Sequence, residues 1–139
     1  STTGKLYNDA GGDYLFDHYP NSGAVPLSFE TVFDKAQDAD VWLMKYNQPT
    51  DKTLSGIRND YSPYAQFKAF KDGQVYGCNT NYAAYYEDFP FHPDLVLKDL
   101  IKIFHPSLLP EYELKYFSKF CSNCNKMKFI RFKKHFHFI

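Results

Sequence analysis

The sequence lacks most of the patterns that identify an enzyme or a membrane-spanning chain. It has no apolar run of about 18 residues, so it contains no transmembrane helix. It has neither a Gly-x-Ser-x-Gly nucleophile motif nor a Gly-x-Gly-x-x-Gly dinucleotide fingerprint. Glu87 and Asp88 are adjacent, and adjacent side chains diverge on regular structure, so they are a poor acid–base pair. We therefore expect a protein that is not an enzyme and needs no cofactor.

The chain also has few cysteines and no net charge. Three cysteines are an odd number and a poor disulfide framework. The 16 basic and 16 acidic residues cancel, which gives no reason to expect a nucleic-acid partner. The N-terminus has no apolar segment of the signal-peptide type. A length of 139 residues predicts one domain.

Charge divides the chain into two regions. Five of the 16 basic residues, and none of the 16 acidic ones, lie in residues 121–139. We therefore predict a domain over 1–120 and a basic, aromatic tail over 121–139 that is disordered or outside the core. Cys121, Cys124, His135 and His137 suggest zinc, but their spacing differs from the finger pattern. Contact of the tail with nucleic acid or anionic lipid is a further alternative.

Within 1–120, apolar periodicity alternates between the strand and helix patterns. Helices are expected at 5–12 (its last turn), 28–37 with Ser28 as N-cap, 51–59 capped by Asp51, 63–71, about 93–104 and 111–120. Strands are expected at 14–16, 41–44 and 74–78, and a long loop at 79–93. The alternation predicts an α/β fold with a small, mostly parallel sheet flanked by helices.

Aromatic residues are unusually abundant, with 12 Tyr, 14 Phe and 1 Trp. Tyr, Asn and His follow the expected strands, and ligands of open parallel sheets bind at the carboxyl ends of strands. This pattern predicts a surface for a bulky ligand, and its candidate residues are Trp42, Tyr46, Asn47, Asn81, Tyr82 and Tyr85. Alternatively, half of the tyrosines only cover the core, and mid-strand Trp42 belongs to it. Arg58 is a further candidate for an anionic ligand or a surface ion pair.

Six segments, in order and spacing, resemble the C-terminal lobe of the cobalamin/iron-siderophore type of periplasmic binding protein. They are GGDYL at 11–15, PLSFETV at 26–32, ADVWL at 39–43, FKAFKDGQVY at 67–76, PDLVLKDL at 93–100 and IFHPSLL at 103–109. The resemblance covers about residues 5–120. It implies a Rossmann-like lobe of a two-lobe solute-binding protein of an ABC importer. Such proteins carry metal chelates such as ferric siderophores, haem or cobalamin.

The resemblance also implies partners and a location. Glu30 matches the carboxylate that docks on the ABC permease, and an N-terminal lobe would supply the other half of the ligand cleft. The location would be the periplasm, either free or on a lipid anchor. One alternative function is a small α/β enzyme or enzyme subunit with a Tyr-rich pocket. Another is a self-associating domain, because an isolated lobe exposes its aromatic cleft face.

Overall fold

The computed structural model describes residues 2–16 and 26–121. It is a mixed α/β fold whose three-stranded sheet has the order β1-β2-β3. The strands are β1 (Trp42–Tyr46), β2 (Val75–Asn79) and β3 (Ser118–Lys119). The helices are α1 (Thr2–Asp9), α2 (Phe29–Ala36), α3 (Leu54–Asp60), α4 (Lys68–Lys71), α5 (Tyr85–Asp88) and α6 (Pro93–Phe104), with 3-10 helices η1 (Ser62–Gln66) and η2 (Pro106–Leu108).

The expected small sheet is present, but its pairing is mixed. β1 and β2 run parallel, and β2 and β3 run antiparallel. Among the described residues, β1 pairs only with β2 and is therefore an edge strand. Four of its residues are half-buried, and Lys45 is exposed.

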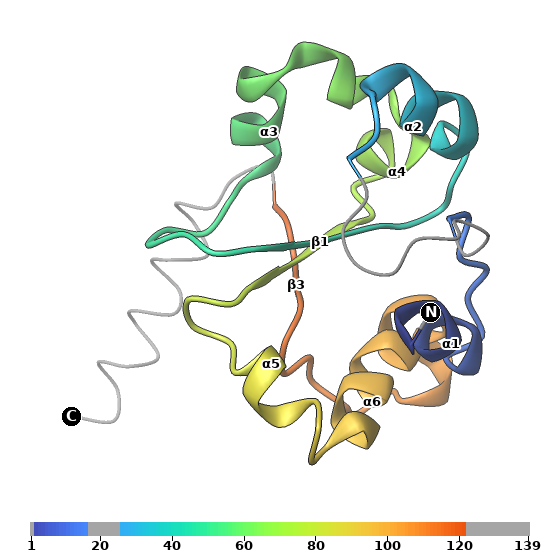
Figure 1. Ribbon diagram of the computed structural model, residues 1–139, viewed down its shortest axis with the longest axis vertical. Helices are drawn as coiled ribbons and strands as arrows, with labels where there is room; N and C mark the ends of the chain where they lie inside the picture. The colour runs from blue at the N-terminus through green and yellow to red at the C-terminus, as the bar shows by residue number, and fades with distance from the viewer. Residues whose placement is uncertain (1, 17–25, 122–139) are drawn as a thin grey trace.

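Helices cover both faces of the sheet (Figure 1). α2, α3, η1 and α4 pack with Trp42, Met44 and Tyr46 around buried Val75. α1, α5 and α6 pack with Leu43 and Tyr76 around buried Cys78. Side chains alternate between the faces of a strand, so adjacent residues of β1 and β2 enter opposite cores.

Local signals locate most helices correctly. The Ser28 hydroxyl accepts a hydrogen bond from Thr31 N–H at 3.2 Å, as expected of the N-cap of α2. α6 begins at Pro93, and α1 is followed by Gly11, whose φ is 81°. α3 differs in its cap. Thr53, not Asp51, caps it through a 2.9 Å hydrogen bond from Gly56 N–H.

Three other expectations are wrong. Residues 14–16 are not a strand: Tyr14 is irregular and packs edge-on against Tyr7 at 5.1 Å, and residues 15–16 form a turn. The helix expected at 63–71 is divided at Phe67, whose extended ψ of 136° separates η1 from α4 and whose ring is buried against α2. The loop at 79–93 contains α5.

The segment 111–120 is also not a helix. Asp99, fully buried on α6, accepts hydrogen bonds from the backbone N–H groups of Lys115, Tyr116 and Phe117 at 2.7–2.9 Å. These amides are therefore unavailable to a helix, and the chain continues extended into β3. The predicted tail, apart from Cys121, lies outside the described residues.

Candidate functional site

The carboxyl ends of β1 and β2 lie side by side. Tyr46, the last residue of β1, is paired in register with Asn79, the last residue of β2. The backbone bonding continues past both strands, because Thr80 N–H donates to Tyr46 C=O at 2.8 Å. The structure thus brings two of the expected strand ends to one edge of the sheet, which we call the exit edge (residues 46–52 and 79–82). The third expected end, at residues 17–18, lies outside the described residues.

Asn79 holds the exit edge together. Its side chain is 7% exposed and bonds both sides of the edge. Its Oδ1 accepts from Gln48 N–H and Asn81 N–H, each at 3.2 Å. Its Nδ2 donates to Gln48 C=O at 2.9 Å and to Asp51 Oδ1 at 3.2 Å. Sequence reasoning placed Asn79 in a strand-end segment without assigning it this role, and its signal is an Asn directly after an apolar strand.

Two tyrosines complete the exit edge. Tyr82 is 70% exposed, and its hydroxyl donates to Pro49 C=O, which attaches the second loop to the first. The Tyr46 hydroxyl accepts from Lys52 N–H at 3.0 Å, and its ring lies 6.0 Å from the Phe120 ring. Tyr82 is thus available to a ligand, whereas Tyr46 mainly supports the edge.

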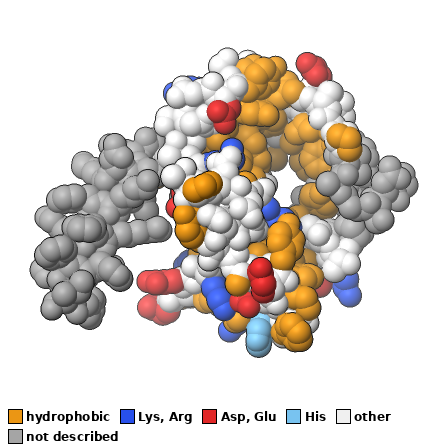
Figure 2. All heavy atoms as spheres, turned by 60° about the vertical axis from the view of Figure 1, so that its left-hand side comes forward, with side chains coloured by type: hydrophobic (Ala, Val, Ile, Leu, Met, Phe, Trp, Pro, Cys, Tyr) orange, Lys and Arg blue, Asp and Glu red, His pale blue; other side chains and the backbone are white. Residues whose placement is uncertain are grey.

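The other predicted residues divide into two groups. Asn47 and Asn81 are exposed at the exit edge, next to Tyr46 and Tyr82. Trp42 lies at the opposite end of β1 and packs in the core against Phe67 at 5.2 Å. Figure 2 brings forward the side of the molecule where the strands end, and shows hydrophobic side chains at the surface among polar and charged ones.

Tyr85 is buried, contrary to the expectation that the long loop would expose it. It is 5% exposed, and its ring stacks on Phe89 at 5.9 Å. Burial raises the pKa of Tyr85 to about 12, so its hydroxyl is neutral at physiological pH. α5 causes this burial, because residues four apart lie on the same face of a helix. The Tyr85–Phe89 spacing is a signal that could have predicted it.

A lysine that sequence reasoning did not select lies beside Tyr85. Lys45, the penultimate residue of β1, places its Nζ 4.6 Å from the Tyr85 ring centre and 5.7 Å from that of Tyr86. Partial burial lowers the pKa of Lys45, although the residue as a whole remains exposed. Tyr86 is 61% exposed.

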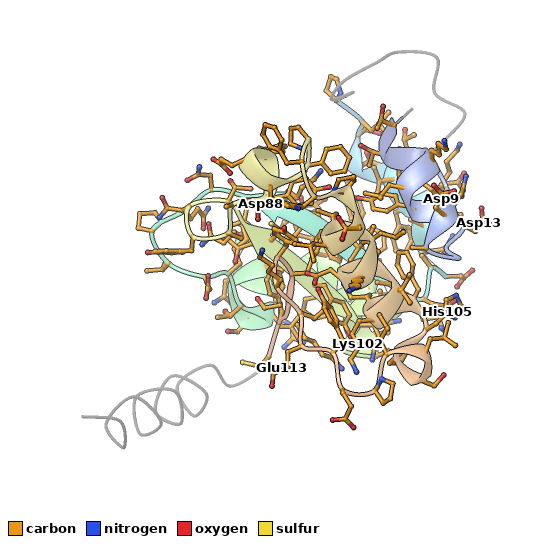
Figure 3. The ribbon with its side chains drawn as sticks, turned by 90° about the horizontal axis from the view of Figure 1, so that it is seen from below. Asp9, Asp13, Asp88, Lys102, His105 and Glu113 are labelled. Atoms are coloured by element: carbon orange, nitrogen blue, oxygen red, sulfur yellow. The ribbon has the colours of Figure 1, made fainter. Side chains whose placement is uncertain are left out.

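Several other candidates lie away from the exit edge. Glu30 is exposed in the first turn of α2. Arg58 lies over the Phe70 ring at 5.4 Å, which gives it a packing role. Figure 3 shows His105 at the end of α6, on the side of Asp13, and its Nε2 lies 3.1 Å from Gly11 C=O. This contact holds α1 on α6.

A shallow hollow of about 520 Å³ lies between α2 and α4. Lys68 in its lining bonds Asp40 at 2.6 Å and Asp72 at 3.5 Å, so its charge is neutralised. The lining contains no predicted ligand residue and consists of Phe33, Gln37, Asp38, Gln66, Lys68, Lys71 and Asp72.

The described residues hold neither a cluster of metal ligands nor a membrane-spanning helix. Residues 2–16 and 26–121 contain no group of three or more potential metal ligands. Of the suggested zinc ligands only Cys121 belongs to these ranges. Within the same ranges, no helix has both the length and the apolar character to cross a membrane.

Comparison with known proteins gave two archaeal relatives, each named an uncharacterized lipoprotein of Methanocaldococcus jannaschii. One is 31% identical over 109 residues, which cover 78% of this chain and 25% of the relative. The other is 30% identical over 116 residues, which cover 83% of this chain and 29% of the relative. The chain thus spans about a quarter of the length of these relatives. No protein-family model matches the sequence, and no solved structure gives a significant match.

Proposed function

We propose that the chain is a Rossmann-like ligand-binding lobe of a membrane-anchored lipoprotein that delivers metal chelates to an ABC importer. Two relatives are named lipoproteins, which supports a lipid anchor. Such an anchor would hold the lobe at the outer face of a membrane, next to a permease. The chelate class, ferric siderophore, haem or cobalamin, comes from the sequence resemblance.

The exit edge is the observation that carries the proposal. Parallel strands that end together create the place where open α/β sheets bind ligands. Here Asn79 fixes both loops, and Asn47, Asn81 and Tyr82 are exposed on them. Amides supply hydrogen bonds, and a tyrosine ring supplies a flat apolar surface, which suits a bulky chelate. Polar groups already fixed by buried bonds lose little entropy when a ligand binds.

The exit edge would provide one wall of a shared cleft. The chain spans about a quarter of its relatives' length, so a second lobe has room in a longer protein of that kind. Losing half of the ligand contacts costs several kcal/mol, and each 1.4 kcal/mol changes the dissociation constant about tenfold. A ligand that a two-lobe protein binds at nanomolar concentration should therefore bind this chain only at about high micromolar concentration.

A fluorescence titration tests the proposal. Haem, cobalamin and a ferric siderophore are added separately to the chain while tyrosine and tryptophan emission is followed. We expect one of these classes to bind at high micromolar concentration, and Tyr82→Ala to weaken it severalfold. Leu108→Ala, on a side chain that is 67% exposed on η2, is the matched control and should have no effect.

Two results would contradict this function. No saturable binding of any of the three classes would remove the chelate-binding role. Submicromolar binding by the isolated chain would show that the site is complete without a second lobe.

Permease docking is tested separately, in a reconstituted importer. Glu30 is exposed in the first turn of α2, and Asp34 lies one helical turn later, also exposed. We expect Glu30→Gln to reduce transport, because a carboxylate binds arginine through charge-assisted hydrogen bonds. Asp34→Asn is the control, and equal loss from both variants would contradict a specific role of Glu30.

A further inference from the structure

Lys45 has no counter-ion in the described part of the chain. Between residues 2–16 and 26–121, no carboxylate forms an ion pair with it, whereas Lys52, Lys68 and Lys115 each have an aspartate partner. Its ammonium instead faces the rings of Tyr85 and Tyr86. A cation over an aromatic face is attracted by the negative charge of the ring face.

The surroundings of Lys45 are neutral as well as aromatic. Cys78 is its partner in the β1–β2 register, and burial raises the pKa of that thiol to about 11. Tyr85 is likewise protonated, because burial raises its pKa to about 12. Neither group therefore carries a negative charge at neutral pH. The positive charge of Lys45 is partly removed from water, and none of the described carboxylates forms an ion pair with it.

Lys45 is also exposed, and it lies next to the proposed binding site. It precedes Tyr46, so it lies next to the exit edge, and β1 is the edge strand of the described sheet. Its neighbour Tyr86 is 61% exposed and meets Tyr85 edge-on, with ring centres 5.3 Å apart. An exposed aromatic ring thus lies beside an ammonium that has no ion-pair partner among the described residues.

We propose that Lys45 and Tyr86 form an anion-selective subsite that binds an aromatic ring carrying an acidic oxygen group. Such a group is a catecholate or an aryl carboxylate. This proposal rests on the proposed function, because it names the charge and chemistry of a ligand that extends from the exit edge to the neighbouring Lys45 and Tyr86. The ring packs on Tyr86, and the acidic oxygen accepts a hydrogen bond from the Lys45 ammonium. Neutral chelates gain nothing from this lysine.

The first experiment compares an anionic ferric catecholate with a neutral ferric hydroxamate. We expect the chain to prefer the catecholate, and Lys45→Met to weaken catecholate binding about tenfold while hydroxamate binding stays within about twofold. Methionine keeps the apolar stem, and Lys45→Arg should retain the preference. Lys98→Met, on an exposed lysine of α6, is the control. Equal weakening of both chelates by Lys45→Met would overturn the proposal, because it would indicate a packing role.

A second experiment separates this proposal from the proposed function. The lysines are methylated with an isotope-labelled reagent, and their NMR signals are followed while dihydroxybenzoate, or uncharged catechol, is added. We expect a saturable shift of the Lys45 signal with dihydroxybenzoate alone, and no shift of the Lys98 signal. If the Lys45 signal does not shift, the subsite is overturned, whether or not the chelates bind. A shift without any chelate binding supports the subsite and removes the chelate-transport function.

Discussion

The Tyr112 hydroxyl donates a 2.6 Å hydrogen bond to the fully buried carboxylate of Asp99. Oδ1 of Asp99 also accepts from Lys115 N–H, and Oδ2 accepts from Tyr116 N–H and Phe117 N–H. One carboxylate thus fixes the path of the segment that leads into β3. The Asp99 oxygens accept all of these bonds. An asparagine at this position would point its NH2 group, a donor, at groups that are themselves donors.

Asp99→Asn is therefore expected to destabilise the fold by about 1–3 kcal/mol, which is the cost of a buried donor left without an acceptor. Urea unfolding followed by circular dichroism measures the change. Glu113→Gln makes the same chemical change at an exposed residue and should have almost no effect. Equal unfolding midpoints for wild type and Asp99→Asn would contradict this role.

Gly77 is a second point at which the same segment is fixed. A Cβ atom at this position would overlap the Phe120 ring and approach Tyr46 Cε1 to 2.9 Å. Gly77→Ala should destabilise the protein by about 1–3 kcal/mol, because overpacking a filled core forces side chains out of place. Phe120→Leu in the same chain should recover part of that loss. If the effects of the two substitutions on the free energy of unfolding simply add, the contact between Gly77 and Phe120 is not the cause.

Asp88 should make stability depend on pH in the acid range. The Tyr116 hydroxyl bonds it at 2.8 Å, and the Lys115 ammonium lies 3.3 Å away. The hydrogen bond from Tyr116, with the help of Lys115, lowers the pKa of Asp88 below its ordinary value of 3.8. A lowered pKa gives stability that is present above the unfolded value and lost as the pH falls through the folded value.

We accordingly expect Asp88→Asn to lower stability at neutral pH and to reduce its decline below about pH 4. Denaturant midpoints across the acid range provide the measurement. Glu87→Gln, at the preceding exposed position, is the control. The prediction is wrong if wild type and Asp88→Asn lose stability in parallel on acidification.

Asn79→Asp tests the exit edge. The amide of Asn79 donates to Gln48 C=O and Asp51 Oδ1. A carboxylate has no hydrogen to donate, so its oxygen would lie against two other acceptors. We expect a loss of about 1–3 kcal/mol in stability and weaker chelate binding. Asn59→Asp, at an exposed position of α3, is the control. Unchanged affinity in a folded Asn79→Asp variant would mean that ligands bind elsewhere.

Local patterns predicted the parts of the fold that local forces determine. The cap at Ser28 and the proline that opens α6 operate within a few residues, so their helices were located correctly. The helix predicted at 111–120 was wrong because Asp99, more than ten positions earlier, binds backbone amides of this segment. The mixed pairing of the sheet has the same cause, since β3 exists only where that segment turns extended.

The candidate site shows a similar division. The sequence predicted that polar and aromatic residues follow the parallel strands, and Asn47, Asn81 and Tyr82 lie at one edge as expected. It did not predict that Tyr85 turns inward, because that depends on the short helix α5. Nor did it identify Lys45, whose position depends on packing between β1 and α5.

The last described segment also determines when the chain can fold during its synthesis. Tyr116 and Phe117 belong to one core, and Phe120 belongs to the other. A ribosome makes these residues after all the helices of the described part of the chain and after both parallel strands. Until they emerge, each core lacks part of its buried aromatic side chains, and β2 lacks its antiparallel neighbour. The two faces of the sheet therefore become stable together, late in translation, and a nascent chain halted before residue 116 should remain sensitive to proteases.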